Sequence, residues 1–255
     1  MPDPFDLSGE TALVFGAGAG GLGAVAARAL GGRGARVLVA DLTARKEDLA
    51  QTLAELTARG VRAEALACDV TDEDSVTAAV GHADRLDMVV NAAGIMLRKS
   101  AVETSVAEFA RVIEVNLTGA WLVDRAAAAR MAGHSGGRIV NIATVYADRV
   151  GPVPESAYYS SKAAVANLTR SMASEFGRAG VHVNCLALGV FYPTKMTAAL
   201  KDTPDLLAWF TERTLLKRLG DPEHDLDGPL LLLASRAGSY MTGQVVYVDG
   251  GWSAW

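Results

Sequence analysis

The sequence has few cysteines and no long uncharged apolar run. Its two cysteines, Cys68 and Cys185, stand alone in apolar stretches without C-x-x-C spacing. A disulfide framework or a zinc site is therefore not expected, and both thiols are interpreted as core residues. No stretch approaches the roughly eighteen apolar residues of a membrane span, and residues 1–4 lack the basic start of a signal peptide. We expect a soluble, cytoplasmic protein that holds no metal.

Clusters of positive charge are also missing. The chain has 24 Lys and Arg against 29 Asp and Glu, a formal net charge of -5, and no basic block. This argues against nucleic acid and against an anionic membrane surface as partners. Any anionic ligand must be bound by local features of the fold. The length of 255 residues and the 50% apolar composition suffice for the core of one large α/β domain.

Five glycines stand between a short apolar strand and an alanine-rich run early in the chain. They are Gly16, Gly18, Gly20, Gly21 and Gly23. The first, second and fourth satisfy G-x-G-x-x-G. Glycine lets the backbone adopt positive φ and approach a ligand closely, while the helix start presents free N–H groups and a positive dipole end. The pattern predicts a diphosphate site; the alternative is a glycine-rich turn without a ligand.

Short β-branched runs alternate with longer helical patterns, which is typical of βαβ units and a parallel sheet. The expected strands cover residues 12–15, 36–40, 62–67, 87–90, 138–142, 181–186 and 244–248. The expected helices cover residues 22–31, 43–59, 72–80, 104–132 and 157–178. We therefore predict one α/β domain, residues 1–255, with a doubly wound, mostly parallel, seven-stranded Rossmann-type sheet.

Acidic and small residues end several expected strands, where a doubly wound sheet binds its ligand. Asp41 ends the second strand, where its carboxylate can accept hydrogen bonds from ribose hydroxyls and would repel a 2′-phosphate, so NAD is favoured over NADP. The alternative is that Asp41 starts the following helix, and Arg45 and Lys46 stand nearby. Asp69 could bind the adenine amino group, and the small residues of 91–94 let a flat cofactor lie against backbone.

Tyr158 and Lys162 stand four residues apart on an expected helix, so both project from one face. A nearby ammonium favours phenolate, and we expect Lys162 to lower the pKa of Tyr158 from about 10 toward about 7. The pair could then exchange protons near neutral pH. Thr144, which ends the fifth strand, can orient a carbonyl or alcohol, and Asn116 could anchor a water between Lys162 and solvent. Taken alone, such a pair is more often solvent-exposed than catalytic.

Residues 189–220 have the least regular pattern and carry much apolar surface. The large apolar side chains are Phe191, Tyr192, Met196, Trp209 and Phe210. We expect a substrate-binding lid that closes over the cofactor and excludes water. The alternative is that Trp209 and Phe210 are fixed on the core.

Together these motifs resemble the short-chain dehydrogenase/reductase family, nearly from end to end. The matching segments are 16–23, 41, 69–70, 91–94, 115–117, 139–144, 157–163, 183–185, 242–244 and 249–251. Carried over by position, the family's Asn-Ser-Tyr-Lys tetrad becomes Asn116, Thr144, Tyr158 and Lys162. The resemblance implies that Tyr158 is the acid/base and that Lys162 also binds the nicotinamide ribose. Thr144 replaces the usual serine and keeps the hydroxyl.

The resemblance also implies cofactor and substrate sites. The cofactor residues would be Gly16, Gly18, Gly21, Leu22, Gly23, Asp41, Leu42, Asp69, Val70, Asn91, Ala92, Ala93, Gly94, Tyr158, Lys162, Gly189 and Thr194. The substrate residues would be Thr144, Tyr146, Tyr158, Phe191, Tyr192, Met196 and Trp209. The glycine loop departs from the family pattern, because Phe15 replaces a threonine and one extra residue precedes Gly21. Ala92 likewise replaces an asparagine.

The implied activity is NAD(H)-dependent interconversion of a secondary alcohol and a ketone or aldehyde. Segments 193–196 and 250–255 look most like members that act on sugars, polyols or sugar acids. A carboxylate substrate would need a cation such as Arg98, Arg149 or Lys195. The alternatives are a nucleotide-binding sensor or scaffold without turnover and an epimerase or dehydratase that recycles its NAD. The resemblance also implies a homotetramer, and alanines in the two long helices would allow close helix approach.

Overall fold

The computed structural model describes residues 3–255, so the first two residues of the start considered above lie outside it. Its strands are β1 (Thr11–Phe15), β2 (Arg36–Asp41), β3 (Ala63–Ala67), β4 (Met88–Asn91), β5 (Gly137–Thr144), β6 (Val181–Leu188) and β7 (Val245–Val248). They form one sheet in the order β3-β2-β1-β4-β5-β6-β7, and every neighbouring pair is parallel. The predicted doubly wound sheet is confirmed, with each expected strand present.

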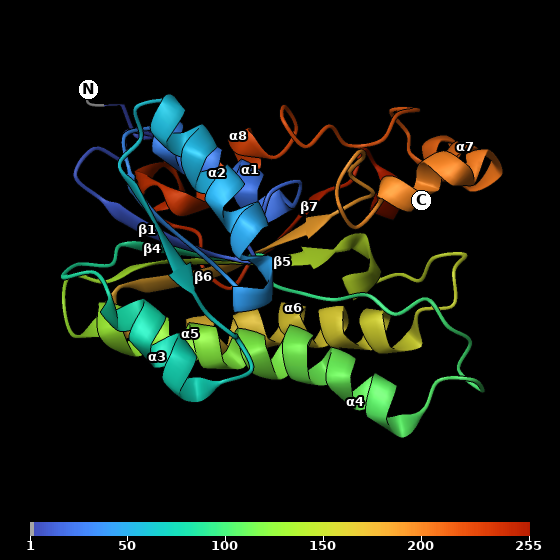
Figure 1. The fold of residues 1–255 in the computed structure, drawn as a ribbon, viewed down its shortest axis with the longest axis horizontal. Helices are drawn as coiled ribbons and strands as arrows, with labels where there is room; N and C mark the ends of the chain where they lie inside the picture. Colours follow the sequence, from blue (N-terminus) through green and yellow to red (C-terminus); the bar gives the residue numbers. More distant parts are fainter. Residues whose placement is uncertain (1–2) are drawn as a thin grey trace.

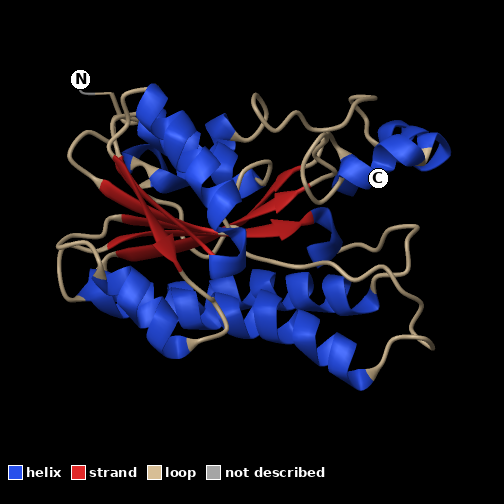
Figure 2. Cartoon of the chain, in the orientation of Figure 1, coloured by secondary structure: helices blue, strands red, loops and turns tan. Residues whose placement is uncertain are grey.

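Two layers of helices cover the sheet (Figures 1 and 2). The upper layer consists of α1 (Leu22–Gly32), α2 (Lys46–Ala58) and α8 (Asp227–Ala234). The lower layer consists of α3 (Glu73–Gly81), α4 (Val106–Ile113), α5 (Gly119–Ala132) and α6 (Ser156–Phe176). The remaining helix, α7 (Pro204–Arg213), lies beyond one end of the sheet, close to the C-terminus.

The strands are apolar on both faces because helices bury both faces. Along β1, Ala12 and Val14 pack under α1 and α8, whereas Leu13 and Phe15 pack toward α3 and α5. Successive side chains of a strand point to opposite faces, so alternate residues enter two separate cores. This explains why the strands read as continuous apolar runs and not as alternating ones.

Two helical expectations need correction. The helix expected over 104–132 is α4 and α5 joined by one π turn, Glu114–Thr118. The wider turn lies where the Asn116 amide leaves the helix to bind Ile95 and Ser161, and such turns are frequent at functional sites. Helix α8 was not expected, because its sequence DGPLLLLA is apolar all round and lacks the 3.6-residue period.

No helix among residues 3–255 is both long enough and apolar enough to span a bilayer. Within the same residues, no group of three or more His, Cys, Asp or Glu side chains is arranged to hold a metal ion.

Candidate active site

A cavity of about 590 Å³ opens at the carboxyl ends of β1, β2, β4, β5 and β6. The predicted site residues that line it are Gly16, Gly21, Leu22, Asp41, Leu42, Asp69, Val70, Ala92, Ala93, Gly94, Thr144, Tyr146, Tyr158, Lys162, Gly189, Phe191, Thr194 and Met196. Six predicted residues in the described part of the chain are not in its wall: Gly18, Gly23, Asn91, Asn116, Tyr192 and Trp209. Strand ends that lie far apart in sequence therefore meet at one hollow, as the parallel sheet requires.

The glycine loop packs backbone against backbone at the switch between β1 and β4. Gly16 has φ of +71°, and a Cβ there would come within 2.7 Å of Ala93 N. A Cβ on Gly23 would come within 2.3 Å of Gly16 O, so the start of α1 also lies directly on the loop. Gly21 is the N-cap of α1 and has no side chain with which to occupy the first N–H groups. This arrangement suits an anionic group at the helix start.

Asp41 is tied to the glycine loop and does not cap a helix. Its Oδ2 accepts from Gly18 N and its Oδ1 from Leu42 N, both at 2.8 Å. Gly18 thus acts on the cavity through Asp41 without lining it. Arg45 lines the same end of the cavity, so a carboxylate and a guanidinium both stand where the second strand ends.

Asn116 is buried, and its amide makes three hydrogen bonds to neighbours. Its Oδ1 accepts from Ile95 N at 2.8 Å, and its Nδ2 donates to Ile95 O at 2.9 Å and to Ser161 Oγ at 3.0 Å. The side chain therefore joins the loop after β4 to α6. The water that the sequence predicts between Lys162 and solvent would be anchored by the second acceptor position of Oδ1, because both N–H groups of the amide are already used.

Tyr158 and Lys162 lie on one face of α6 and both border the cavity. Lys162 Nζ donates to Ile142 O at 2.8 Å, and burial lowers the pKa of Lys162 to about 8. Burial raises the pKa of the Tyr158 phenol above its ordinary value, and repulsion from Glu155 and Tyr159 adds to the rise. The predicted lowering of the Tyr158 pKa is therefore wrong for this structure, because desolvation of the phenolate outweighs the attraction of the Arg98 guanidinium.

The substrate side of the cavity is built by Thr144, Tyr146, Phe191 and Met196. Thr144 is buried at the end of β5, where its Oγ1 accepts from Tyr146 N at 3.5 Å. Burial raises the pKa of the Tyr146 phenol well above its usual range, so this hydroxyl stays protonated. The wall thus offers neutral hydroxyl groups beside Tyr158.

Arg98 is the cation that the loop after β4 brings to the cavity. Its Nε donates to Glu155 Oε1 at 2.8 Å, and Glu155 is almost fully buried in the same wall. The next residue, Lys99, donates its backbone N–H to Pro154 O at 3.0 Å and its Nζ to Glu108 at 2.9 Å. The residue after Arg98 is therefore anchored through both its backbone and its side chain, and the guanidinium N–H groups of Arg98 other than Nε are available to a ligand.

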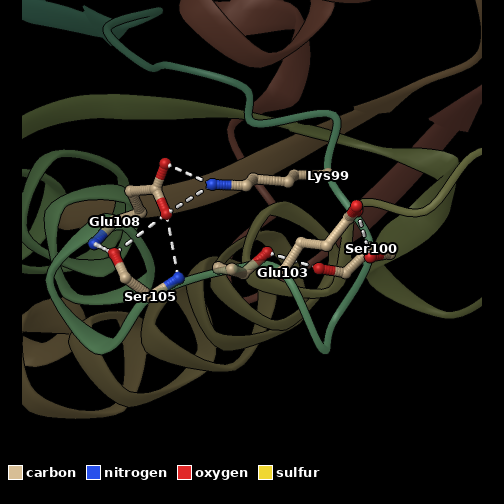
Figure 3. A network of polar contacts seen from close by, with 6 residues as sticks. Lys99, Ser100, Glu103, Ser105 and Glu108 are labelled. Carbon is tan, nitrogen blue, oxygen red and sulfur yellow. Dashed lines mark hydrogen bonds and ion pairs between the residues drawn. The ribbon is translucent and has the colours of Figure 1, made fainter.

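Glu108 closes a capping box that fixes this loop (Figure 3). Its Oε2 accepts from Ser105 N at 2.8 Å, and Ser105 Oγ accepts from Glu108 N at 3.2 Å. The hydrogen bond from Lys99 is the main reason that the pKa of Glu108 is lowered to about 2. The start of α4 and the loop that carries Arg98 are thus held by one polar network.

The other two candidate cations are engaged elsewhere. Lys195 Nζ pairs with Asp48 on α2, and Arg149 pairs with Asp148 and donates to Ser253 O. Lys195 borders the cavity, whereas Arg149 is not part of its wall. Of the three cations, Arg98 is the one whose location and free donors suit a carboxylate.

The segment 189–220 is more regular than its sequence suggested. It contains the 3₁₀ helix Ala198–Asp202 and α7, and Phe210 of α7 is buried. Trp209 is 43% exposed and packs against Phe210 and Trp252, with ring centroids 5.5 and 5.6 Å apart. Trp209 is therefore not part of the cavity wall, whereas Phe210, on which it packs, is part of that wall.

Glu155 is the functional candidate that sequence reasoning missed. It is the N-cap of α6 and precedes Tyr158 by three residues. That spacing was the signal available in the sequence. The pairing of Glu155 with Arg98 depends on the fold, because the two residues are 57 positions apart.

Comparisons with known proteins place the chain among dehydrogenases and reductases. A family model described as enoyl-(acyl carrier protein) reductase matches residues 16–253. The 5-keto-D-gluconate 5-reductase of Escherichia coli (strain K12) is 35% identical over 255 residues and covers 98% of both chains. The gluconate 5-dehydrogenase of Gluconobacter oxydans (strain 621H) is 38% identical over 256 residues, 98% of this chain and 97% of that one. A gluconate 5-dehydrogenase structure from Burkholderia cenocepacia J2315, in complex with NADP and tartrate, has a TM-score of 0.92 at 31% identity, covering 99% and 98% of the two chains.

The fold, the site and these relatives define an oxidoreductase that acts on CH–OH groups. The chain belongs to the short-chain dehydrogenase/reductase family, as its motifs indicated. A pyridine nucleotide is the cofactor expected for such a dehydrogenase. The residues present fit this cofactor. Gly94 has no side chain, and a Cβ there would lie 3.3 Å from Asn116 Oδ1 and 3.5 Å from Lys162 Nζ. Glycine at this position and in the glycine loop therefore leaves room for a ligand beside these two side chains.

Proposed function

We propose that the protein is an NAD(H)-dependent oxidoreductase that interconverts a secondary alcohol of a sugar acid and the corresponding ketone. The observation that carries the proposal is one cavity wall that combines Thr144, Tyr158 and Lys162 with Arg98. A guanidinium pinned by Glu155 at one N–H keeps other N–H groups for a substrate carboxylate. The sugar-acid names of the relatives support the same substrate class.

In the proposed reaction the cofactor carries the hydride and the side chains of the site carry the proton. The nicotinamide, when bound, supplies or accepts the hydride. During reduction, the Thr144 and Tyr158 hydroxyls donate hydrogen bonds to the carbonyl oxygen as it gains negative charge, and Tyr158 then transfers its proton to that oxygen. During oxidation, Tyr158 accepts the proton from the alcohol. Lys162 holds the backbone of β5 at Ile142 O and would bind the nicotinamide ribose.

The glycine loop and the start of α1 would bind the diphosphate, while Asp41 and Leu42 would flank the adenosine ribose. The preference for NAD rests on the Asp41 carboxylate, which lines the cavity at that end. Arg45 lines the same end, and the Burkholderia relative is in complex with NADP. Titration with NADH and with NADPH tests the preference. Tighter binding of NADPH would overturn the preference for NAD and would indicate that Arg45 binds the ribose end of the cofactor.

We also propose that the chain assembles as a homotetramer. Phe109 and Trp121, on α4 and α5, are 39% and 41% exposed, which supports a partner surface on the lower layer. A sedimentation mass equal to that of a single chain would rule out the tetramer.

We propose further that residues 189–220 act as a lid. The lid is supported by its contact with the glycine loop, where Lys195 N donates to Gly20 O at 2.7 Å.

The direct test of function is a substrate panel followed through nicotinamide absorbance. Sugar acids, keto sugar acids, polyols and simple secondary alcohols should be run with NAD or NADH, with Tyr158→Phe as the blank. Turnover of a sugar acid by the wild type alone supports the proposal. Cofactor binding without turnover of any compound would favour the sensor or scaffold. Conversion of a sugar with no net absorbance change would favour an epimerase or dehydratase.

A further inference from the structure

A buried polar cluster joins β5 of the sheet to α5 and α6 of the lower helix layer, whose ribbons Figure 1 shows. Its members are Asp124 on α5, Asn141 on β5 and Thr169 on α6, each at most 1% exposed. Asn141 Nδ2 donates to Asp124 Oδ2 at 2.8 Å and to Thr169 Oγ1 at 3.2 Å. Thr169 Oγ1 donates in turn to Val165 O at 3.0 Å. Three elements are therefore tied by one set of side chains.

Two oxygens in this cluster have no partner. Among the described residues, four buried side-chain polar atoms lack a hydrogen bond, and two of them are Asp124 Oδ1 and Asn141 Oδ1. With Asp124 ionised, both oxygens are acceptors, and neither can satisfy the other. A single proton on Asp124 Oδ1 turns that atom into a donor and leaves Asn141 Oδ1 as its acceptor. A neutral carboxylic acid carries one donor and one acceptor, as a carboxamide does, so the two groups are complementary at two positions.

We propose that Asp124 is held as a neutral carboxylic acid, joined to Asn141 by two antiparallel hydrogen bonds, and that this pair positions β5 and α6 for catalysis. Asp124 is a positioning residue, because it acts through Asn141 and touches none of the reacting groups.

The cluster connects to every element that carries the catalytic set. Asn141 directly precedes Ile142, whose carbonyl oxygen accepts the hydrogen bond from Lys162 Nζ at 2.8 Å. Thr169 follows Lys162 by seven residues, which is two turns along the same face of α6. Asp124 lies on the helix that follows the π turn containing Asn116. Loosening the pair therefore disturbs the backbone that holds Lys162 and Thr144.

Burial raises the pKa of Asp124 to about 7, and the hydrogen bond from Asn141 opposes the rise. The titratable group facing it from β6 is Cys185, which pairs with Asn141 in the sheet register and whose thiol pKa burial raises to about 12. From α6, Lys162 and Arg170 act on the same thiol and lower its pKa. An acid with a raised pKa binds more protons in the folded state, so it makes stability fall as pH rises from about 4 to about 7 and level off above that.

Asp124→Asn is the decisive variant, because its amide reproduces the donor and acceptor of the neutral acid but cannot ionise. Stability should be measured by denaturant unfolding between pH 5 and pH 9 for both proteins. Relative to the variant, the wild-type folding equilibrium constant should fall about fiftyfold from pH 5 to pH 7. The ratio of variant to wild-type kcat should rise through pH 7 in both reaction directions, which a purely structural role would not produce.

Asp87→Asn is the matched control, since both Asp87 oxygens already accept hydrogen bonds, from Thr11 N and Arg85 Nε. In Asp87→Asn the new amide N–H group would face a donor, Thr11 N or Arg85 Nε, so the variant should be less stable than the wild type. The difference in unfolding free energy between this variant and the wild type should not shrink as pH rises. An infrared carbonyl band of a protonated carboxyl at pH 6, lost in Asp124→Asn, would support the proposal directly. Identical pH dependence in wild type and Asp124→Asn, or the absence of that band, would overturn it.

Discussion

The glycine-loop half of the cavity and the segment 189–220 are built in different ways. In the first half, strand register and backbone contacts fix each residue, as where a Cβ on Gly16 would strike Ala93 N at 2.7 Å. In the second, aromatic rings pack edge to face or tilted, with Trp252 lying 5.9 Å from Phe210 and 5.6 Å from Trp209 between ring centroids. Backbone crowding permits one arrangement, whereas side-chain contacts of this kind can separate. We therefore expect the cofactor side to be preformed and the substrate side to be the part able to adapt.

The segment is nevertheless held at its far end. Arg213 donates to Trp255 O at 2.7 Å, and Trp255 Nε1 donates to Arg213 O at 3.0 Å. The Arg213 guanidinium also lies near the rings of Trp252 and Trp255. Both contacts are at the surface, so they add little energy each and can break without unfolding the core.

The largest expected effect belongs to Tyr158, which borders the cavity and packs in one buried cluster with Phe210 and Trp252. Tyr158→Phe removes the acid/base hydroxyl and should lower kcat about 10²–10⁴-fold in both directions, while NADH binding stays intact. Steady-state rates and NADH fluorescence titration measure the two. Tyr159→Phe is the control, because that hydroxyl donates to Val153 O at 2.7 Å and only borders the cavity. A near-normal rate for Tyr158→Phe would remove Tyr158 from the mechanism.

Two substitutions in the glycine loop separate the effect of backbone strain at positive φ from the effect of crowding against neighbouring backbone. Gly16→Ala and Gly20→Ala both place a Cβ at positive φ, at +71° and +76°, which costs roughly 1–3 kcal/mol of stability. Only Gly16→Ala also strikes backbone, since the nearest atom to a Cβ on Gly20 is Lys195 Cβ at 3.7 Å. We expect at least a tenfold weaker NADH affinity for Gly16→Ala alone. Equal affinities in the two variants would show that loop crowding does not shape the cofactor site.

The smallest effect is expected in the adaptable half. Trp209→Ala removes a ring that bridges Phe210 and Trp252, so residues 190–212 should be cleaved faster by protease and the substrate KM should rise a few-fold, with NADH affinity unchanged. Tyr240→Ala, at a fully exposed aromatic, is the control and should change neither. If NAD plus substrate gives no protection of residues 190–212 in the wild type, the segment is fixed and the lid proposal fails.

The same contrast explains what the sequence could predict. The doubly wound parallel sheet, the glycine loop and the strand-end residues follow from periodicity and motif spacing, because parallel strands place their carboxyl ends at one edge. The burial that raises the pKa of Tyr158 could not be predicted, since it depends on side chains from several elements. Nor could the outward placement of Trp209, which depends on how α7 packs on Trp252. Helix α8 was not predicted because its run of apolar residues shows no 3.6-residue period.

The central claim is that Arg98 and the tetrad serve one sugar-acid substrate, and the most direct test is a ratio of kcat/KM values. A six-carbon sugar acid should be compared with the polyol of the same length, in the wild type, in Arg98→Ala and in Arg149→Ala as the control. Loss of a charged hydrogen bond costs about 1.5–3 kcal/mol, so Arg98→Ala should lower kcat/KM for the acid about 10-fold to 150-fold and leave the polyol within about twofold. An unchanged acid-to-polyol ratio in Arg98→Ala would contradict the account.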